Sequence, residues 1–441
     1  AADVEDGGAG EVGAAGVEKQ GVEEFGGVLG QGAVEQLRAG LFVADGAEEG
    51  PGAGERREAA GAGEHTCRLV GTMKILLLCW RDSTHPQGGG SERYLERVGE
   101  YLARQGHEVV YRTAGHTDAP RRSHRDGVRY SRSGGKFSVY PRAWYGILLG
   151  RGGFGTLGDI DVVVDTQNGI PFFARLVAGR PTVLLTHHCH REQWPVAGRI
   201  LARLGWFLEL QVAPRVYRGA PYVTVSQNSR DELVGLGVDA EDITIIGNGV
   251  DPLPANVPQL RSAEGTTYLV TLSRLVPHKQ LEHAIDVIAA LRDRELVLDV
   301  IGSGWWDDQL REHARRRGVE DRVVFHGQVT EDYKHALLAR ASVHLMPSRK
   351  EGWGLAVMEA AQHGVPTIGY RSAGGLRDSI VDGETGLLVD TPAELTVCTT
   401  RLLDAPELTA RLGAAARTRA QGFSWELTGE RFAALLQQLR A

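Results

Sequence analysis

A regular alternation of short apolar runs with longer amphipathic runs constrains the fold of this chain more than any other feature of its sequence. From Met73 onward, apolar runs such as residues 74–80 are each followed by a segment with helical periodicity. In residues 91–105, for example, Tyr94 and Val98 recur on one helical face. Strands that alternate with helices indicate βα units, which build parallel sheets covered by helices. The pattern therefore predicts an α/β protein with doubly wound parallel sheets.

The alternation occurs in two series. The predicted strands are residues 74–80, 108–113, 161–165, 182–186 and 222–226, then 268–272, 296–301, 323–326, 343–347 and 367–370. Between the series, prolines interrupt any regular element. We expect two Rossmann-like domains at 73–250 and 265–423, a linker at 251–264, and a C-terminal helix in 424–441 that packs back on the first domain. Ligands are expected at the carboxyl ends of the strands, in a cleft between the two domains.

Residues 1–72 differ in composition from the rest of the 441-residue chain. They hold 14 acidic residues, 5 basic residues and 18 of the 58 glycines, whereas the remaining 369 residues hold 44 basic and 42 acidic ones. They also contain too few large apolar side chains to form an ordered core. We expect a disordered extension, which could be translated from sequence upstream of a true start at Met73; a short appended domain is the alternative. The net charge of −7 therefore says nothing about partners.

The cysteines and the apolar runs indicate in which cellular compartment the protein is expected. The four cysteines lie far apart without metal-ligand spacing, and no signal peptide precedes them, which favours a cytoplasmic protein. No run approaches the roughly 18 apolar residues of a spanning helix. We expect no membrane-spanning segment, and peripheral attachment to the inner face of the membrane stays open.

Two glutamates eight positions apart form the strongest chemical signal. Glu351 is expected just before a helix and Glu359 two turns inside it; on a continuous helix they would lie within about 80° of each other. The N–H groups of Gly354, Leu355 and Ala356 are expected to point out of the helix N-terminus, where anions bind. The pattern indicates an anion site flanked by two hydrogen-bond acceptors. Two solvated helix charges are the alternative.

This segment closely resembles the Glu, seven residues, Glu motif of the retaining GT-B glycosyltransferases, particularly the large family four. The resemblance covers Met73 to the end of the chain, with several motifs in the same order. It implies the GT-B architecture, in which the first domain binds the acceptor and the second binds a nucleotide sugar. It also implies that Glu359 holds the ribose hydroxyls, the Leu355 and Ala356 N–H groups hold the phosphate, and Glu351 holds the sugar.

Arg274 and Lys279 resemble the Arg and Lys pair that this family carries after the first strand of its second domain. Two fixed cations there can neutralise the diphosphate as it leaves. Surface charges on a loop are the alternative. The family usually has glycine where this chain has Ser273 and Gln280, so the details of the loop stay open.

Glycine turns complete the predicted donor site. Gly302 and Ser303 resemble the family's turn on the nucleotide side, and Val329 lies in a segment whose backbone resembles the one that receives the base. Before the first helix, Gly89 and Gly90 permit backbone contact with the donor phosphate or the acceptor. That run is not GxGxxG, and no acidic residue follows the second strand, so a nicotinamide enzyme is disfavoured. Plain turns are the alternative.

A dense polar cluster follows the strand predicted at 182–186. Its resemblance to the family's Thr-x-His places His188 beside the transferred sugar. The expected acceptor contacts are His187, His190, Arg191, Glu192 and Trp194. A metal site is disfavoured because no carboxylate has the necessary spacing. A structural, hydrogen-bonded histidine is the alternative.

No cofactor or metal is expected. Asp159 and Asp161 imitate a metal-binding DxD, but they stand at the beginning of a predicted strand, away from the expected cleft. Retention through a nucleophile would need a placed carboxylate in the first domain, and the sequence identifies none. Front-side displacement, with charge stabilisation by the cations and helix amides, is preferred.

Residues 121–151 hold eight basic residues and one acid, Asp126, with interleaved aromatics that include Phe137 and Tyr145. Such a surface could dock on anionic lipid or hold a phosphorylated acceptor. Solvated loops and a core helix are the alternative. Nucleic acid is disfavoured, because the chain after residue 72 is near neutral and lacks a known binding motif.

These observations predict a metal-independent, retaining hexosyltransferase that uses a nucleoside diphosphate sugar. The expected acceptor is lipid-linked, part of the cell envelope, or a small metabolite. The alternatives are a nucleotide-sugar epimerase or a phosphorylase on the same fold, and a non-catalytic nucleotide-sugar-binding protein. The presence of Glu351, Arg274 and Lys279 together favours the enzyme.

Overall fold

The computed structural model describes residues 71–85, 88–155, 157–189 and 198–440. The chain separates into two compact units, one of residues 73–189 with 213–441 and the other of residues 1–72 with 190–212. The second unit is represented by α6 (Arg199–Phe207) and a π-helical segment, η3 (Leu208–Val212). The predicted extension lies outside the described residues, apart from Gly71 and Thr72, and stays a prediction.

Eight strands form the first sheet: β1 Lys74–Leu78, β2 Glu108–Thr113, β3 Arg122–Arg125, β4 Val128–Arg132, β5 Val162–Gln167, β6 Thr182–Thr186, β7 Tyr222–Thr224 and β8 Ile243–Ile245. Their order is β3-β4-β2-β1-β5-β6-β7-β8. All neighbours are parallel except β3, which runs antiparallel to β4. The parallel strands end at one edge of the sheet, which is where open α/β sheets bind ligands.

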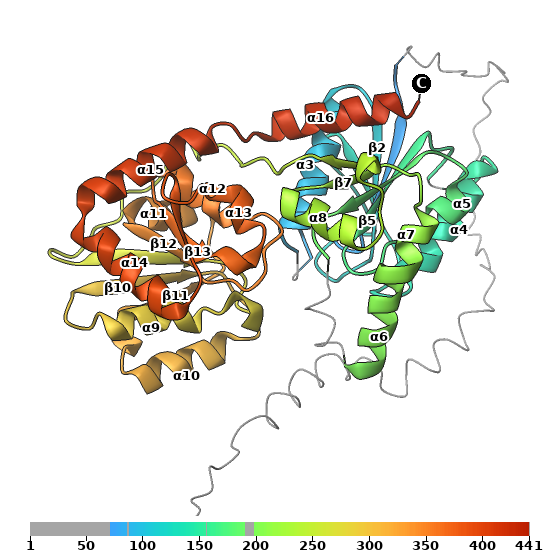
Figure 1. The fold of residues 1–441 in the computed structure, drawn as a ribbon. Coiled ribbons are helices and arrows are strands. Elements are labelled where there is room, and N and C mark those ends of the chain that lie inside the picture. The colour runs from blue at the N-terminus through green and yellow to red at the C-terminus, as the bar shows by residue number, and fades with distance from the viewer. Residues whose placement is uncertain (1–70, 86–87, 156, 190–197, 441) are drawn as a thin grey trace, which may run out of the picture. The chain divides into compact units, whose positions relative to one another are not determined.

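Helices cover both faces of this sheet (Figure 1). They are α3 Gly90–Arg104, α4 Val139–Arg151, α5 Arg175–Ala178, α7 Ala213–Val216 and α8 Gln227–Gly235, with a 3-10 turn at η4 Ala240–Asp242. Helix α3 begins directly after glycines because the Glu92 carboxylate accepts a hydrogen bond from the Gly89 N–H at 2.8 Å. Its apolar face, which includes Tyr94 and Val98, is buried against β1 and β2.

Six parallel strands form the second sheet: β9 Thr267–Leu272, β10 Leu296–Ile301, β11 Val323–Gly327, β12 Val343–Met346, β13 Thr367–Tyr370 and β14 Gly386–Val389. Their order is β11-β10-β9-β12-β13-β14. Numbered within the sheet, this is the 3-2-1-4-5-6 order of a doubly wound nucleotide-binding fold.

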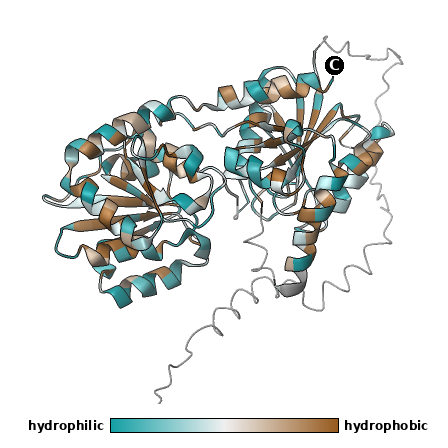
Figure 2. Cartoon of the chain, in the orientation of Figure 1, coloured by the Kyte–Doolittle hydropathy of each residue, from teal (hydrophilic) through white to brown (hydrophobic). Residues whose placement is uncertain are grey.

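The second sheet is also covered on both faces. Its helices are α9 Glu282–Ala290, α10 Asp307–Arg317, α11 Glu331–Arg340, α12 Leu355–Gln362, α13 Leu376–Ser379, α14 Pro392–Asp404 and α15 Pro406–Ala420, with 3-10 turns η5 Pro277–Lys279, η6 Glu320–Arg322 and η7 Arg371–Ala373. Helices α9, α10 and α14 share one apolar cluster with the strands. Helices α11, α12, α13 and α15 cover the opposite face. Figure 2 shows the apolar residues concentrated on the strands and on the helix faces toward them.

The last helix, α16 (Trp425–Gln438), packs against α3 of the first sheet (Figure 1). Phe432 and Leu436 are fully buried in the same cluster as β1 and β2. The two helices approach closely at Gly429, where an added Cβ would stand 2.2 Å from Tyr101 Cγ. The C-terminal helix thus contributes to the core of the first sheet.

The two predicted doubly wound parallel sheets are confirmed, and each predicted strand is found with its ends within two residues. Four further strands, β3, β4, β8 and β14, were not predicted from the sequence. β3 is a polar strand at the edge of the sheet, and β8 and β14 have only three and four residues, too few to show a period. Among the helices of the described residues, none has the length and apolar character that crossing a bilayer requires.

Candidate active site

The loop between β12 and α12 holds Glu351 by its backbone. The Glu351 N–H donates to the Ala373 carbonyl at 2.8 Å, and the Glu351 carbonyl accepts from the Gly375 N–H at 3.1 Å. Helix α12 begins at Leu355, after Gly354 at φ +96°. Glu351 precedes the helix, as predicted, whereas the prediction that Glu359 lies two turns inside it is wrong. Glu351 lies outside the helix and Glu359 is one turn inside it, not two, because Gly354 breaks the helical geometry between them.

Glu351 forms an ion pair with Lys279, with 2.5 Å between Oε1 and Nζ. Both side chains are largely buried, at 10% and 13% exposed. Lys279 ends the turn η5, and the two loops are joined again where the Arg349 N–H donates to the His278 carbonyl at 2.8 Å. Burial, together with the charge of Lys279, lowers the pKa of His278 to about 4, so this ring is neutral at pH 7.

Arg274 occupies the turn directly after β9. Its side chain is open to solvent yet crowded by protein atoms, and this partial desolvation, with the charge of Arg81, lowers its pKa. Glu92 and Glu351 oppose that effect. Arg274 therefore lies within electrostatic reach of residues from both sheets.

Gly302 and Ser303 lie against the Arg274 turn. The Leu275 N–H donates to the Ser303 carbonyl at 3.0 Å, and the Ser273 N–H donates to the Ile301 carbonyl at 3.1 Å. Gly302 has φ +122°, and an added Cβ would stand 1.9 Å from the Ser273 oxygen. Only glycine fits this position, so the predicted glycine turn fixes the loop that carries Arg274.

The N-terminus of α12 presents amide groups beside this pair of loops. Leu355 and Ala356 are its first residues, so their N–H groups have no carbonyl partner within the helix. One turn later, Glu359 forms an ion pair with Lys334 of α11 at 2.5 Å. Burial alone would lower the pKa of Lys334, but Glu359 and Glu331 together outweigh burial, and the pKa is raised. Val329 stands just before α11, after Gly327 at φ +66°.

The first sheet contributes a charged loop that the sequence analysis did not assign. Arg81 follows β1, and its Nε donates to the Glu92 carboxylate at 3.0 Å. The other Glu92 oxygen accepts from the Gly89 N–H and the Ser91 hydroxyl. Asn168, at the end of β5, donates to Glu92 at 3.3 Å. Burial alone would raise the pKa of Glu92, but Arg81 and these donors lower it, so the carboxylate is charged.

Residues of the two sheets meet at the glycines of these loops. An added Cβ at Gly90 would stand 2.9 Å from Leu355 Cδ1, and one at Gly352 would stand 3.4 Å from His188 Nδ1. His188 therefore borders the Glu351 loop. The signal that could have found Arg81 and Asn168 is their position at the carboxyl ends of neighbouring strands.

His187 is buried rather than open to a ligand. Its ring packs edge-on against Tyr94, with the ring centroids 5.1 Å apart. Its carbonyl accepts a hydrogen bond from the Ser229 hydroxyl at 2.7 Å. The acceptor role assigned to His187 stays a prediction. The other predicted acceptor contacts, His190, Arg191, Glu192 and Trp194, lie outside the described residues.

The Asp159-Ile160-Asp161 segment precedes β5, as predicted. Asp161 accepts a hydrogen bond from the Lys74 N–H at 2.7 Å, and Asp159 pairs with Arg180 at 3.0 Å. Both carboxylates thus stabilise the start of the sheet. In the part of the chain that the structure describes, no three His, Cys, Asp or Glu side chains are grouped to hold a metal.

Comparison with known proteins gives matches over most of the chain. The description Glycosyltransferase Family 4 matches residues 88–252, and Glycosyl transferases group 1 matches residues 254–419. The MMP alpha-(1->4)-mannosyltransferase of Mycolicibacterium hassiacum is 33% identical over 62% of this chain and 69% of its own length. A GDP-mannose-dependent alpha-(1-6)-phosphatidylinositol monomannoside mannosyltransferase of Mycolicibacterium smegmatis is 31% identical over 60% and 72%.

Two solved structures share the fold at lower identity. Sucrose-phosphate synthase from Thermosynechococcus elongatus superposes with a TM-score of 0.69 at 21% identity, over 83% of this chain and 98% of that one. A glycosyltransferase from Rickettsia africae gives 0.64 at 14% identity, over 83% and 98%. At such identities the likeness shows the fold alone.

Proposed function

The chain belongs to glycosyltransferase family 4, with the GT-B fold, and from this premise we propose that it transfers a hexosyl group from a nucleoside diphosphate sugar to an acceptor hydroxyl with retention of configuration. The observation that carries the proposal is the convergence of Arg274, the Lys279–Glu351 pair and the N-terminus of α12. Two cations and free amides form a site for a diphosphate.

The proposed roles follow from the contacts. Arg274 and Lys279 neutralise the charge that develops on the leaving diphosphate, and the Leu355 and Ala356 N–H groups bind its oxygens. Lys279 holds one oxygen of Glu351, which leaves the other to accept from sugar hydroxyls. Glu359 binds the ribose, and Gly302, Ser303 and Val329 border the nucleotide.

We favour front-side displacement without a metal ion. The carboxylate next to the Gly89–Gly90 loop is Glu92, and both of its oxygens already accept hydrogen bonds, so it is poorly placed to attack the sugar. In the proposed step the bond from the sugar to the diphosphate breaks, and the acceptor oxygen bonds to the same face. The acceptor proton passes to the leaving phosphate oxygen. His188 borders the transferred sugar.

Donor binding tests the proposal. Unfolding temperatures are measured with GDP-mannose first, because a relative is named for that donor, and then with other GDP-, UDP- and ADP-sugars. A ligand at 100 times its Kd stabilises a protein by about 2.7 kcal/mol. We expect protection by one nucleotide class and its loss in Arg274→Gln, with Arg261→Gln in the linker as the charge-matched control. Absence of any shift would refute the donor site.

A further inference from the structure

A cavity outside the donor site opens at the carboxyl ends of β2 and β4. Its volume is about 380 Å³. The lining comes from the loops after these two strands and from the start of α4: Gly115, His116, Thr117, Ala119, Arg121, Arg132, Ser133, Gly134 and Arg142. The position is the edge at which the first sheet is expected to bind ligands.

Two of the three arginines around this cavity lack a carboxylate partner. Arg132 is neutralised by Asp82, with 2.6 Å between Nε and Oδ2. For Arg121 and Arg142, by contrast, no ion pair occurs among the described residues, although Asp118 lies in the same loop as Arg121. Within the described residues, the Arg142 guanidinium donates only to the Ser133 hydroxyl, at 3.2 Å. Both guanidinium groups are thus open to an anion.

A fourth arginine, Arg112, does not line the cavity but adds positive charge next to it. Arg112 on β2 is 8% exposed, and its donors meet the Ser131 hydroxyl at 2.8 Å and the Arg142 carbonyl at 3.4 Å. Its Nε has no hydrogen-bond partner among the described residues. Burial, with the charge of Arg142, lowers its pKa, yet a guanidinium stays protonated at pH 7. A buried cation without a carboxylate raises the affinity of its surroundings for an anion.

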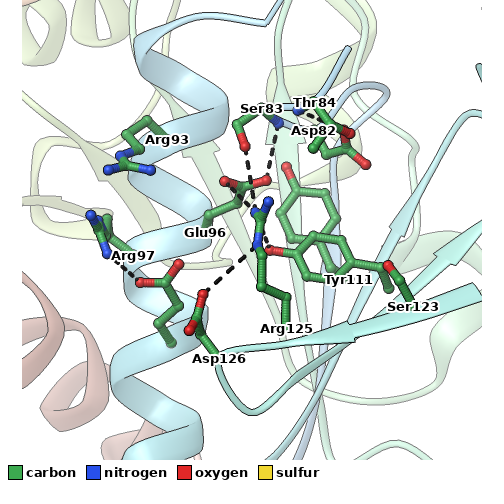
Figure 3. A network of polar contacts seen from close by, with 12 residues as sticks. Asp82, Ser83, Thr84, Arg93, Glu96, Arg97, Tyr111, Ser123, Arg125 and Asp126 are labelled. Atoms are coloured by element: carbon green, nitrogen blue, oxygen red, sulfur yellow. Dashed lines mark hydrogen bonds and ion pairs between the residues drawn. The ribbon is translucent and has the colours of Figure 1, made fainter. Parts of the chain in front are cut away.

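Two neighbouring arginines, Arg125 and Arg132, are satisfied by carboxylates of the same domain. Figure 3 shows Glu96 between the Ser83 N–H and Arg125, with 3.0 Å in each contact. Burial alone would raise the pKa of Asp82, but the Thr84 hydroxyl and Arg132 lower it. Arg125 and Arg132 therefore have their counter-ions, and the excess charge belongs to the cavity.

Contacts between aromatic rings and a guanidinium connect the cavity to the donor site. His116, in the lining, packs edge-on against His85 with 5.3 Å between ring centroids, and His85 packs against Trp80 at 5.6 Å. Arg81 lies over the Trp80 ring at 4.2 Å. Arg81 is also the cation that pairs with Glu92 and acts on Arg274. This series of side-chain contacts leads from the cavity lining to the residues of the proposed donor site.

We propose that this cavity binds a phosphate group of the acceptor, held by Arg121 and Arg142 next to the buried charge of Arg112. This inference rests on the proposed transferase function and specifies its acceptor class: a phosphomonoester or phosphodiester whose hydroxyl lies some distance from the phosphate. Two sources share that chemistry, a free phosphorylated metabolite and the headgroup of a phospholipid.

Binding of phosphate is measured by calorimetry on the full chain, with inorganic phosphate and glycerol 3-phosphate as probes. The nucleotide diphosphate that gives thermal protection is kept saturating, so that the donor site is filled. The variants are Arg121→Gln, Arg142→Gln and their combination. Arg122→Gln is the matched control, because Arg122 is an exposed neighbour on β3 that does not line the cavity.

We expect each single variant to weaken phosphate binding roughly tenfold, the effect of losing one charge-assisted hydrogen bond. Nucleotide binding and the unfolding temperature should not change, and Arg122→Gln should bind like the parent chain. No phosphate binding by the parent chain, or an equal loss in Arg122→Gln, would overturn the proposal. If no nucleotide protects the protein, the proposed function fails, while the phosphate titration without nucleotide still decides this inference.

A second arm distinguishes the two sources. Phosphatidylcholine vesicles with and without phosphatidylinositol are sedimented with the parent chain and the double variant. Retention on phosphatidylinositol that the double variant loses supports a headgroup, and binding of glycerol 3-phosphate without such retention supports a free metabolite. In transfer assays the double variant should raise the KM for a phosphorylated acceptor and leave the KM for the donor unchanged. A change confined to the donor KM contradicts the proposal.

Discussion

Glu351 is the residue on which the proposed chemistry depends most directly. Its backbone is fixed by Ala373 and Gly375, and one carboxylate oxygen is fixed by Lys279. A side chain held at so many points is preorganised, which is how an active site stabilises a transition state without reorganising. The Lys279 ion pair is thus a positioning contact as well as a source of charge.

Glu351→Gln should therefore lower kcat roughly 100-fold while nucleotide affinity changes little, because the substitution removes charge at the sugar and not at the diphosphate. His188→Ala should have the same pattern. The measurements are steady-state transfer and thermal protection by the nucleotide. Glu384→Gln, an exposed residue, is the control. Transfer at the parental rate in both variants would remove the assigned roles.

His344 gives the protein a defined acid sensitivity. It is fully buried on β12, its Nδ1 lies 3.0 Å from the Thr367 hydroxyl, and burial lowers its pKa from 6.5 to about 3. The unfolded chain therefore binds a proton at His344 more readily than the folded chain does. The contribution of neutral His344 to the free energy of unfolding is complete above pH 6.5 and is lost as the pH falls toward 3.

Lowering the pH from about 7.5 to about 5 should therefore cost about 2 kcal/mol through this group alone. Urea unfolding at both pH values measures the loss, and His344→Asn, which keeps a hydrogen-bonding side chain toward Thr367, should show about 2 kcal/mol less of it. An identical pH dependence in both proteins would mean that His344 is not neutral in the folded state.

At the scale of elements, the turn after β10 is as constrained as any catalytic residue. Gly302→Ala would drive a methyl group into the Ser273 carbonyl and displace the loop that carries Arg274. Gly318 at the end of α10 also has a positive φ, +65°, but an added Cβ there meets nothing within 4 Å. Comparing alanine substitutions at these two glycines therefore separates the cost of a steric clash from the cost of a strained backbone.

Gly318→Ala should lower the free energy of unfolding by about 1 kcal/mol, the ordinary cost of a left-handed conformation. Gly302→Ala should lower it by about 3 kcal/mol and weaken nucleotide binding as well. Chemical unfolding and nucleotide titration measure the two effects. Equal losses, with unchanged nucleotide affinity in both, would show that the turn yields more easily than its geometry implies.

Helices and strands whose apolar residues repeat at a regular spacing could be predicted from the sequence. The elements that were not predicted lack such a spacing. The buried strands and α3 repeat apolar residues over enough positions to be recognised, whereas the exposed β3 does not. The start of α12 was misplaced because Gly354 leaves the helical region, which no spacing rule registers. Gln280 likewise takes φ +51°, where the family's glycine costs nothing.

The candidate site was predictable where a motif occupies one stretch of chain, as in Glu351 to Glu359. Arg81 and Asn168 both reach Glu92 only because β1 and β5 are neighbours in the sheet, and that pairing is a property of topology. The partner of Glu359, Lys334, comes from another helix and carries no local signal.

At the scale of the whole molecule, we expect α4 and the residues just before and after it to form the surface that contacts a membrane, because basic and aromatic side chains are mixed there. Phe137, Tyr145, Leu148 and Phe154 are 50% to 70% exposed, and Arg142 and Arg151 lie among them in the sequence. Exposed aromatic side chains beside cations are typical of segments that lie on anionic lipid.

The chain should sediment with anionic vesicles at low salt and be released as salt is raised. Replacing Tyr145 and Phe154 with serine should reduce binding by roughly tenfold or more, since each aromatic contributes about 1.5–3 kcal/mol when buried. Val397→Ser, which is 65% exposed on α14, is the control. Failure of the parent chain to sediment at low salt would exclude the membrane contact.

The return of α16 to the first sheet has a consequence for how the protein is made. Phe432 and Leu436 belong to the core around β1, whose residues leave the ribosome more than 300 positions earlier. The first sheet therefore waits, with the side of α3 that receives α16 uncovered, until α16 has been synthesised and has cleared the exit tunnel. A chaperone that shields α3 during translation would protect the nascent chain through this interval.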